Sequence, residues 1–246
     1  MLATTLQDTS FRVRSELLNK FVNMVVSRRL GPNFYVLAFI TAHDPEKEIR
    51  DRARNWVSIQ MRRLPVELRV QHFDMLFIRL LHLLAHHPDF SETGEGLQDM
   101  AKYIEFYLDI IATAENVSLQ FHLALKAKTV RDSESHVFSE HLYVLSELAQ
   151  HLIRARAKNR QWTLNTYPGK VKIPADIFRP LPNHEAASKI SKKEYLPEEH
   201  LQWLAAAGKP HSKTRRAADD ANGKDKDKKP ARKRKAAASG RTNGTS

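Results

Sequence analysis

Apolar residues along the first two hundred positions recur at three- and four-residue intervals, which is the spacing of amphipathic helices. This pattern covers residues 11–30, and the next segment, residues 33–43, is apolar nearly all round. Asp44 and Pro45 then offer an N-cap residue followed by proline at the first helical position, which predicts a third helix over residues 45–64. We therefore expect successive helices joined by short breaks.

A fourth helical pattern follows Pro65, and Pro88 ends it because proline disfavours a helical conformation in the residue before it. Three further patterns run over residues 97–114, 117–133 and 136–158. Seven helices with short links and almost no strand signal predict an all-α fold. This fold is either a closed bundle or an open helical-repeat stack.

The second and third helices favour the stack. An apolar helix, a tight Asp-Pro turn and a second helix with Ile49, Arg50 and Ala53 in the pattern I-R-x-x-A are typical of one HEAT repeat. The aspartate would cap the helix, the proline would fix the turn, and the alanine would allow close helix packing. We therefore predict HEAT-like helical repeats, an α-solenoid, over residues 1–159.

The pattern of residues along the chain changes after these helices. The segment from residue 160 to residue 197 contains five prolines, an alternating stretch WTLNTY and few helical signals. It predicts an extended strap over the preceding helices, followed by a last short helix that ends at Gly208. Residues 160–208 are thus expected to be a strap and terminal helix that pack on the repeats.

The formal net charge of +12 is concentrated in residues 209–246, where thirteen Lys and Arg against four Asp and Glu give +9 and leave about +3 for the rest. This segment contains no leucine, isoleucine, valine or aromatic residue, so it cannot bury enough apolar surface to offset its ordering entropy. We predict a disordered basic tail.

The tail also carries a candidate nuclear-import signal in two basic clusters. These clusters contain Arg215, Arg216, Lys228, Lys229, Arg232, Lys233, Arg234 and Lys235. An import receptor is one expected partner of these side chains. The same charges would bind nucleic-acid phosphates without sequence preference, and a third possibility is a tail that only keeps the chain in solution.

The sequence offers no support for an enzyme. It lacks cysteine, the G-x-S-x-G elbow of serine hydrolases and the glycine-rich loops that hold phosphates or dinucleotides. We expect no catalytic residues, no cofactor and no metal. Its apolar runs are much shorter than the roughly 20 residues that span a bilayer, so no membrane partner is expected.

The stretch HLLAHHPDF, residues 82–90, was the one candidate for a metal site. His82 and His86 share a helix face, and Asp89 offers a third ligand. The segment between the histidines is Leu-Leu-Ala, so the glutamate that acts as general base in H-E-x-x-H metalloproteases is absent. We interpret His86 and His87 instead as residues of the last helical turn, where imidazoles bind free carbonyls and suit the helix dipole.

An ordered set of motifs resembles a known family. HLLAHHPDF, TVRDSESHVFSEHLYVLSELAQHLI, KIPADIFRPL and EYLPEEHLQWLAAAGKP are similar, in order and spacing, to the C-terminal part of the precocious-dissociation-of-sisters proteins. These are the HEAT-repeat regulatory subunits of cohesin. The resemblance covers about residues 34–210. His87 departs from it, because the family usually has an acidic residue at that position.

The resemblance implies a nuclear, chromatin-associated scaffold without catalytic residues. It also implies partners: the cohesin complex through its kleisin subunit, a Wapl-type releasing factor and the cohesin acetyltransferase, in maintaining or dissolving sister chromatid cohesion. Family members are several times longer, so we expect this chain to be a C-terminal piece or the product of a mis-started gene model. The family's kleisin and Wapl contacts lie mostly upstream, so no binding residues are transferred to this chain.

Overall fold

Helices make up most of the computed structural model, which describes residues 2–196, 200, 203 and 204. The α-helices are α1 (Leu2–Thr5), α2 (Phe11–Val26), α3 (Lys47–Arg63), α4 (Val66–Arg69), α5 (Leu76–Ala85), α6 (Gly94–Ile111), α7 (Val117–Ala127), α8 (His136–Arg160) and α9 (His184–Lys192). Two helical segments are wound differently, the 3₁₀ segment η1 (Pro32–His43) and the π segment η2 (Val70–Asp74). Two short strands, β1 (Val130–Asp132) and β2 (Phe178–Pro180), complete the described elements.

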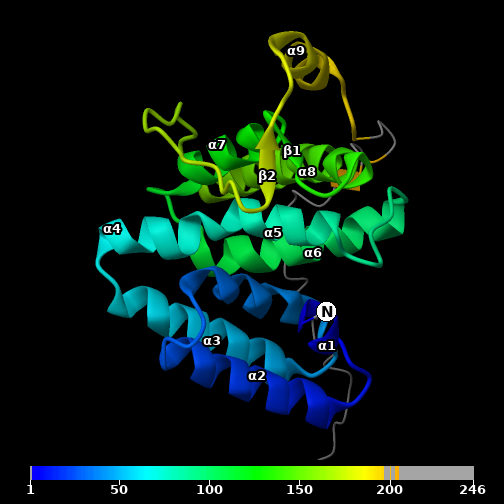
Figure 1. Cartoon of the computed structure of the whole chain (residues 1–246). Coiled ribbons are helices and arrows are strands. Elements are labelled where there is room, and N and C mark those ends of the chain that lie inside the picture. Colours follow the sequence, from blue (N-terminus) through cyan, green and yellow to red (C-terminus); the bar gives the residue numbers. More distant parts are fainter. Residues whose placement is uncertain (1, 197–199, 201–202, 205–246) are drawn as a thin grey trace, which may run out of the picture. The chain divides into compact units, whose positions relative to one another are not determined.

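The helices pack in chain order, as in a helical-repeat stack (Figure 1). Helices α2 and α3 contact η1, which in turn contacts α5 and α6. Helices α5 and α6 also contact α8, and α8 packs along α7. One continuous apolar core joins these layers, with Phe39, Phe77 and Tyr107 among its largest fully buried side chains. The predicted all-α, HEAT-like fold is confirmed.

The second predicted helix has a 3₁₀ winding rather than an α winding over Pro32–His43. Its side chains from Leu37 to Thr41 are all buried, as its apolar composition predicts. Because nearly every position is apolar, the pattern carries no 3.6-residue period and could not reveal the winding. The segment packs on α3 as the first member of the predicted repeat pair.

The predicted single helix over residues 66–87 is interrupted by the π segment at Val70–Asp74. The carbonyls of Phe73 and Asp74 lie 2.9 and 3.2 Å from the buried Tyr107 hydroxyl, to which they can serve as acceptors. A side chain from α6 therefore supplies a partner where the regular helical hydrogen bonds change, which is a typical setting of a π bulge. No local sequence signal marks this interruption.

Asp44 has a different role from the predicted N-cap. Helix α3 begins at Lys47 with Glu46 at the N-cap position, while Asp44 Oδ1 accepts a hydrogen bond from the Glu46 amide at 2.9 Å. The Asp44 carboxylate also binds Arg14 of α2, with Nε to Oδ2 at 2.8 Å and Nη2 to Oδ1 at 3.3 Å. Both side chains are buried, so this ion pair joins α2 to the turn before α3.

The strap is extended between α8 and β2 but also contains two regular elements that the sequence did not predict. Strand β2 pairs antiparallel with β1, with Val130 opposite Pro180 and Asp132 opposite Phe178. Helix α9 follows, capped by the side chain of Asn183, which accepts from the Ala186 amide at 2.7 Å. The helix is short and has no buried residue, so the spacing of hydrophobic residues gave little signal for it.

Two polar contacts hold the strap on the helices. Arg79 of α5 binds Asp176 with two parallel hydrogen bonds of 2.8 and 3.0 Å. Glu147 of α8 accepts from the backbone amides of Tyr195 and Leu196 at 2.8 and 2.7 Å, and its other oxygen accepts from Lys128 at 2.6 Å. Residues far apart in sequence are thereby fixed together.

The expected tail and part of the terminal helix fall outside this description. Of the terminal helix, the structure describes His200, Trp203 and Leu204, and Leu204 is buried. The predicted disordered tail and the import candidates Arg215, Arg216, Lys228, Lys229, Arg232, Lys233, Arg234 and Lys235 lie outside the described residues.

Candidate functional site

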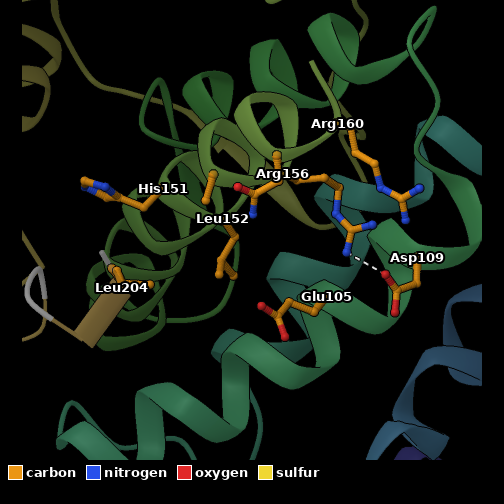
Figure 2. A pocket seen from close by; sticks show the side chains of 9 residues that line it. Glu105, Asp109, His151, Leu152, Arg156, Arg160 and Leu204 are labelled. Atoms are coloured by element: carbon orange, nitrogen blue, oxygen red, sulfur yellow. Dashed lines mark hydrogen bonds and ion pairs between the residues drawn. The ribbon is translucent and has the colours of Figure 1, made fainter. Parts of the chain in front are cut away.

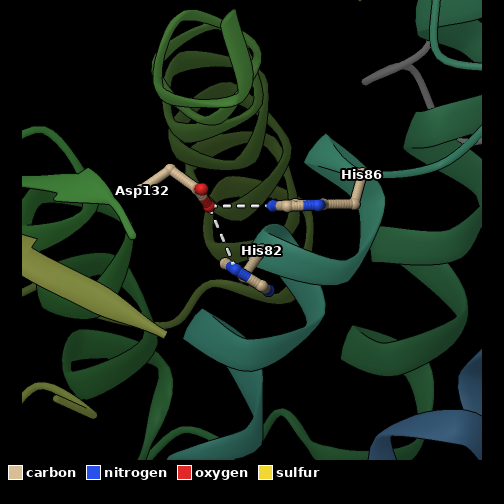
Figure 3. A group of neighbouring side chains, drawn as sticks. All are labelled: His82, His86 and Asp132. Carbon is tan, nitrogen blue, oxygen red and sulfur yellow. Dashed lines mark hydrogen bonds and ion pairs between the residues drawn. The ribbon is translucent and has the colours of Figure 1, made fainter. Parts of the chain in front are cut away.

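Two histidines of α5 point toward β1 and meet an aspartate there (Figure 3). One face of α5 is fully buried, and His82 and His86 lie one turn apart on another part of its surface. Their rings are 4.4 Å apart between centroids. His82 Nε2 lies 3.0 Å from Asp132 Oδ2, and His86 Nε2 lies 2.8 Å from the same oxygen.

The Asp132 carboxylate is held in place by its own chain. Its side chain is fully buried, and Oδ1 accepts hydrogen bonds from the amides of Glu134 and Ser135 at 2.7 and 3.2 Å. The Asp132 amide donates to Ser139 Oγ of α8 at 3.0 Å. These contacts leave Oδ2 directed at the two imidazoles.

The electrostatics favour a neutral His82 and an ionised Asp132. Burial lowers the pKa of His82, and the neighbouring His86 lowers it further. Burial alone would raise the pKa of Asp132, but the hydrogen bonds from His86, Glu134 and Ser135 bring it below its ordinary value. A carboxylate thus faces an imidazole that stays neutral, and these are the forms in which both side chains bind metals.

The sequence interpretation of this stretch was partly wrong. Asp89, considered as the third member, is 82% exposed at its side chain and its carboxylate lies 3.9 Å from His87 Nδ1. His86 is the C-cap residue of α5, as expected, but its ring binds Asp132 instead of the last carbonyls. His87 is buried and its Nε2 lies 3.1 Å from Gln7 Oε1.

Asp132 could not be found by spacing, because it lies 46 residues from His86. Only the packing of β1 against the end of α5 brings the three side chains together. Within the described residues, this is the group of histidine and acidic side chains whose ligand atoms lie close enough to hold one ion.

A hollow lies between α6 and α8, apart from the histidine cluster (Figure 2). It is lined by side chains of both charges together with the apolar Leu152 and Leu204. Arg156 Nη2 donates to Asp109 Oδ1 at 2.6 Å, as the dashed line in the figure shows. Burial raises the pKa of the neighbouring Glu105, and Arg156 lowers it in part.

Together these features define a helical-repeat protein. In the part of the chain that the structure describes, no helix is long and apolar enough to span a membrane.

Comparison with known proteins gives the family. The family model described as "Sister chromatid cohesion protein PDS5 protein" matches residues 1–179. The chain is 34% identical over 197 residues to the sister chromatid cohesion protein pds5 of Schizosaccharomyces pombe, which covers 77% of this chain and 16% of that protein. It is 26% identical to the PDS5 protein of Saccharomyces cerevisiae over 224 residues, covering 80% of the chain and 17% of the relative.

A human relative, PDS5 homolog B, is 26% identical over 229 residues, covering 85% of this chain and 15% of that protein. The chain belongs to the PDS5 family, which confirms the resemblance drawn from its motifs. It spans between 15 and 17% of the length of these three relatives.

Proposed function

We propose that this chain is a non-catalytic scaffold segment that helps a regulator of sister chromatid cohesion contact cohesin on chromatin. Membership of the PDS5 family, whose relatives are named for sister chromatid cohesion, is the observation that carries the proposal. The helical-repeat fold supports it, because such stacks present extended surfaces to protein partners.

One surface of the described residues fits protein contacts. It is the α6–α8 hollow, in which carboxylates and guanidinium groups lie beside apolar side chains.

Co-purification with cohesin tests the role of this segment. Cohesin would be recovered from nuclear extract with the full-length parent protein and with a version lacking residues 34–204. We expect the deletion to lower recovery, and equal recovery by the two proteins would refute a contribution of this segment to cohesin binding.

A charge reversal then localises the contact. Arg160→Glu changes an exposed residue at the edge of the α6–α8 hollow, and Arg62→Glu makes the same change at an exposed position of α3. We expect only Arg160→Glu to weaken recovery of cohesin. Equal effects of the two variants would assign the loss to net charge instead of this surface.

The partners follow from the family resemblance. The kleisin subunit of cohesin and a Wapl-type releasing factor are the proposed contacts of the full-length protein, and the proposed location is the nucleus on chromatin. An import receptor would bind the basic tail. Replacing Arg232, Lys233, Arg234 and Lys235 by alanine in a reporter fusion should move it to the cytoplasm, and unchanged nuclear accumulation would argue against import through these residues.

A second candidate function is direct binding of chromatin or DNA by the same tail. The concentration of positive charge in residues 209–246 favours it, since phosphate contacts by Lys and Arg release counterions. Its signature is an affinity that falls steeply with salt and is lost when residues 224–235 are deleted. Salt-independent binding, or binding that survives the deletion, would exclude this mode.

A further inference from the structure

His82, His86 and Asp132 lie outside the α6–α8 hollow considered above for protein contacts. We propose that these three side chains bind a divalent transition-metal ion, with Zn²⁺ the ion that they suit best (Figure 3). Two imidazole nitrogens and one carboxylate oxygen are ligand types that zinc accepts in proteins, and a water molecule can occupy the fourth position.

The distances are close to those of a coordination site. The three ligand atoms all lie within 4.8 Å of one another, and Asp132 Oδ2 is 3.0 and 2.8 Å from the two Nε2 atoms. Zinc bonds of about 2.0–2.1 Å in a tetrahedron place neighbouring ligand atoms roughly 3.3 Å apart. The two oxygen–nitrogen separations are therefore a few tenths of an ångström, roughly, shorter than in a tetrahedral site.

Hydrogen bonding alone does not account for the arrangement. His86 Nε2 makes an aligned hydrogen bond to Asp132 Oδ2. His82 Nε2 lies near the same oxygen but outside hydrogen-bond alignment, and it is a buried nitrogen without an aligned partner. A buried polar atom in that state is costly, whereas a metal ion between the three groups would accept one lone pair from each ligand atom.

The surroundings fix the ligands in place. The His82 ring packs edge-on against Phe178 of β2 at 5.3 Å, and the His86 ring stacks on Phe138 of α8 at 3.8 Å. His86 Nδ1 lies 3.8 Å from the exposed carboxylate of Glu134, which is beyond hydrogen-bond distance.

Such an ion would cross-link parts of the fold. It would join α5 to β1 and, through the β1–β2 pair, to the strap. Leu83, Leu84 and Ala85 stand between the histidines, so the helix offers no glutamate there to activate a bound water. The proposal concerns this cluster alone and is independent of which partner the scaffold binds.

Zinc titration of the intact 246-residue chain tests the site. The chain is treated with a chelator, freed of it, and titrated with Zn²⁺ in a calorimeter. We expect one ion per chain, and replacement of a ligand in His82→Ala or Asp132→Asn should weaken binding by at least roughly 100-fold. His184→Ala removes an exposed histidine of α9 and should leave binding unchanged.

His86→Gln keeps a hydrogen-bond donor for Asp132 but removes the imidazole, and circular dichroism reports whether each variant is folded. Three results would overturn the proposal. They are zinc binding by folded His86→Gln and Asp132→Asn as tight as by the unaltered chain, loss of binding in His184→Ala, and absence of binding by the unaltered chain. If the variants do not fold, Co²⁺ in the unaltered chain decides. An intense visible spectrum of tetrahedral cobalt supports the site, and a weak octahedral spectrum contradicts it.

Discussion

Asp74 gives the sharpest test of the electrostatics inside the stack. It ends the π segment η2, is 4% exposed, and its Oδ1 accepts a hydrogen bond from Asn116 Nδ2 at 2.8 Å. Burial raises the pKa of this carboxyl group from its ordinary value of 3.8 to about 6, and the hydrogen bond from Asn116 limits the rise. Ionised Asp74 therefore destabilises the folded protein near neutral pH.

The size and the sign of this effect follow from linkage. A folded-state pKa above the unfolded one means that the folded protein holds the proton more tightly, so stability is lost as the pH rises from about 4 through 6. A shift of about two pKa units corresponds to about 3 kcal/mol above pH 6 and to about 1.5 kcal/mol at pH 5.

Asp74→Asn removes the charge and keeps an oxygen that can accept from Asn116. We expect the variant to raise the free energy of unfolding in urea by up to about 3 kcal/mol at pH 7.5 and by about half of that at pH 5. Asp89→Asn, at an 82% exposed side chain, controls for the loss of one negative charge. A destabilised Asp74→Asn, or a gain that does not depend on pH, would refute this reasoning.

Three other substitutions test the packing. Glu147→Ala removes the acceptor of two strap amides and leaves the buried Lys128 ammonium with the Lys193 carbonyl but no carboxylate, so it should cost about 3–5 kcal/mol. It should also speed proteolysis within the strap, and an unchanged cleavage rate would contradict this. Arg14→Met leaves the buried Asp44 carboxylate without its cation and should lower the free energy of unfolding in urea by about 3–5 kcal/mol. Arg12→Met, on the exposed side of the same helix, should leave that free energy unchanged within experimental error. Gln161 ends α8 in the left-handed conformation at φ 58°, which glycine adopts at lower cost, so Gln161→Gly should stabilise the protein by about 0.5–1 kcal/mol and raise its thermal midpoint. A lower midpoint would count against this.

The helices themselves could be predicted because their buried and exposed faces alternate with a helical period. Helix α8 shows this well, since its buried positions repeat along 25 residues from His136 to Arg160. The 3₁₀ winding of η1 and the π segment before α5 could not be predicted. The first has no period to read, and the second depends on Tyr107, which arrives from another helix.

Only part of the candidate site could be predicted, for the same reason. The i, i+4 spacing of His82 and His86 follows from helical geometry, so the sequence shows that they share a face. Their partner Asp132 depends on how a strand packs against the helix, and no local pattern contains that information. The buried ion pair of Arg14 with Asp44 was missed likewise, because its two members are 30 residues apart.

The anchoring of the strap has a consequence for the order in which the chain folds. Its contacts join residues that are distant in sequence, 97 residues apart for Arg79 and Asp176 and 65 for Lys128 and Lys193. Closing such loops is slow compared with pairing α7 and α8, which are neighbours along the chain. During synthesis, His82 is therefore made long before Phe178, and the side of its ring that Phe178 covers stays open to solvent and to ions until β2 has left the ribosome.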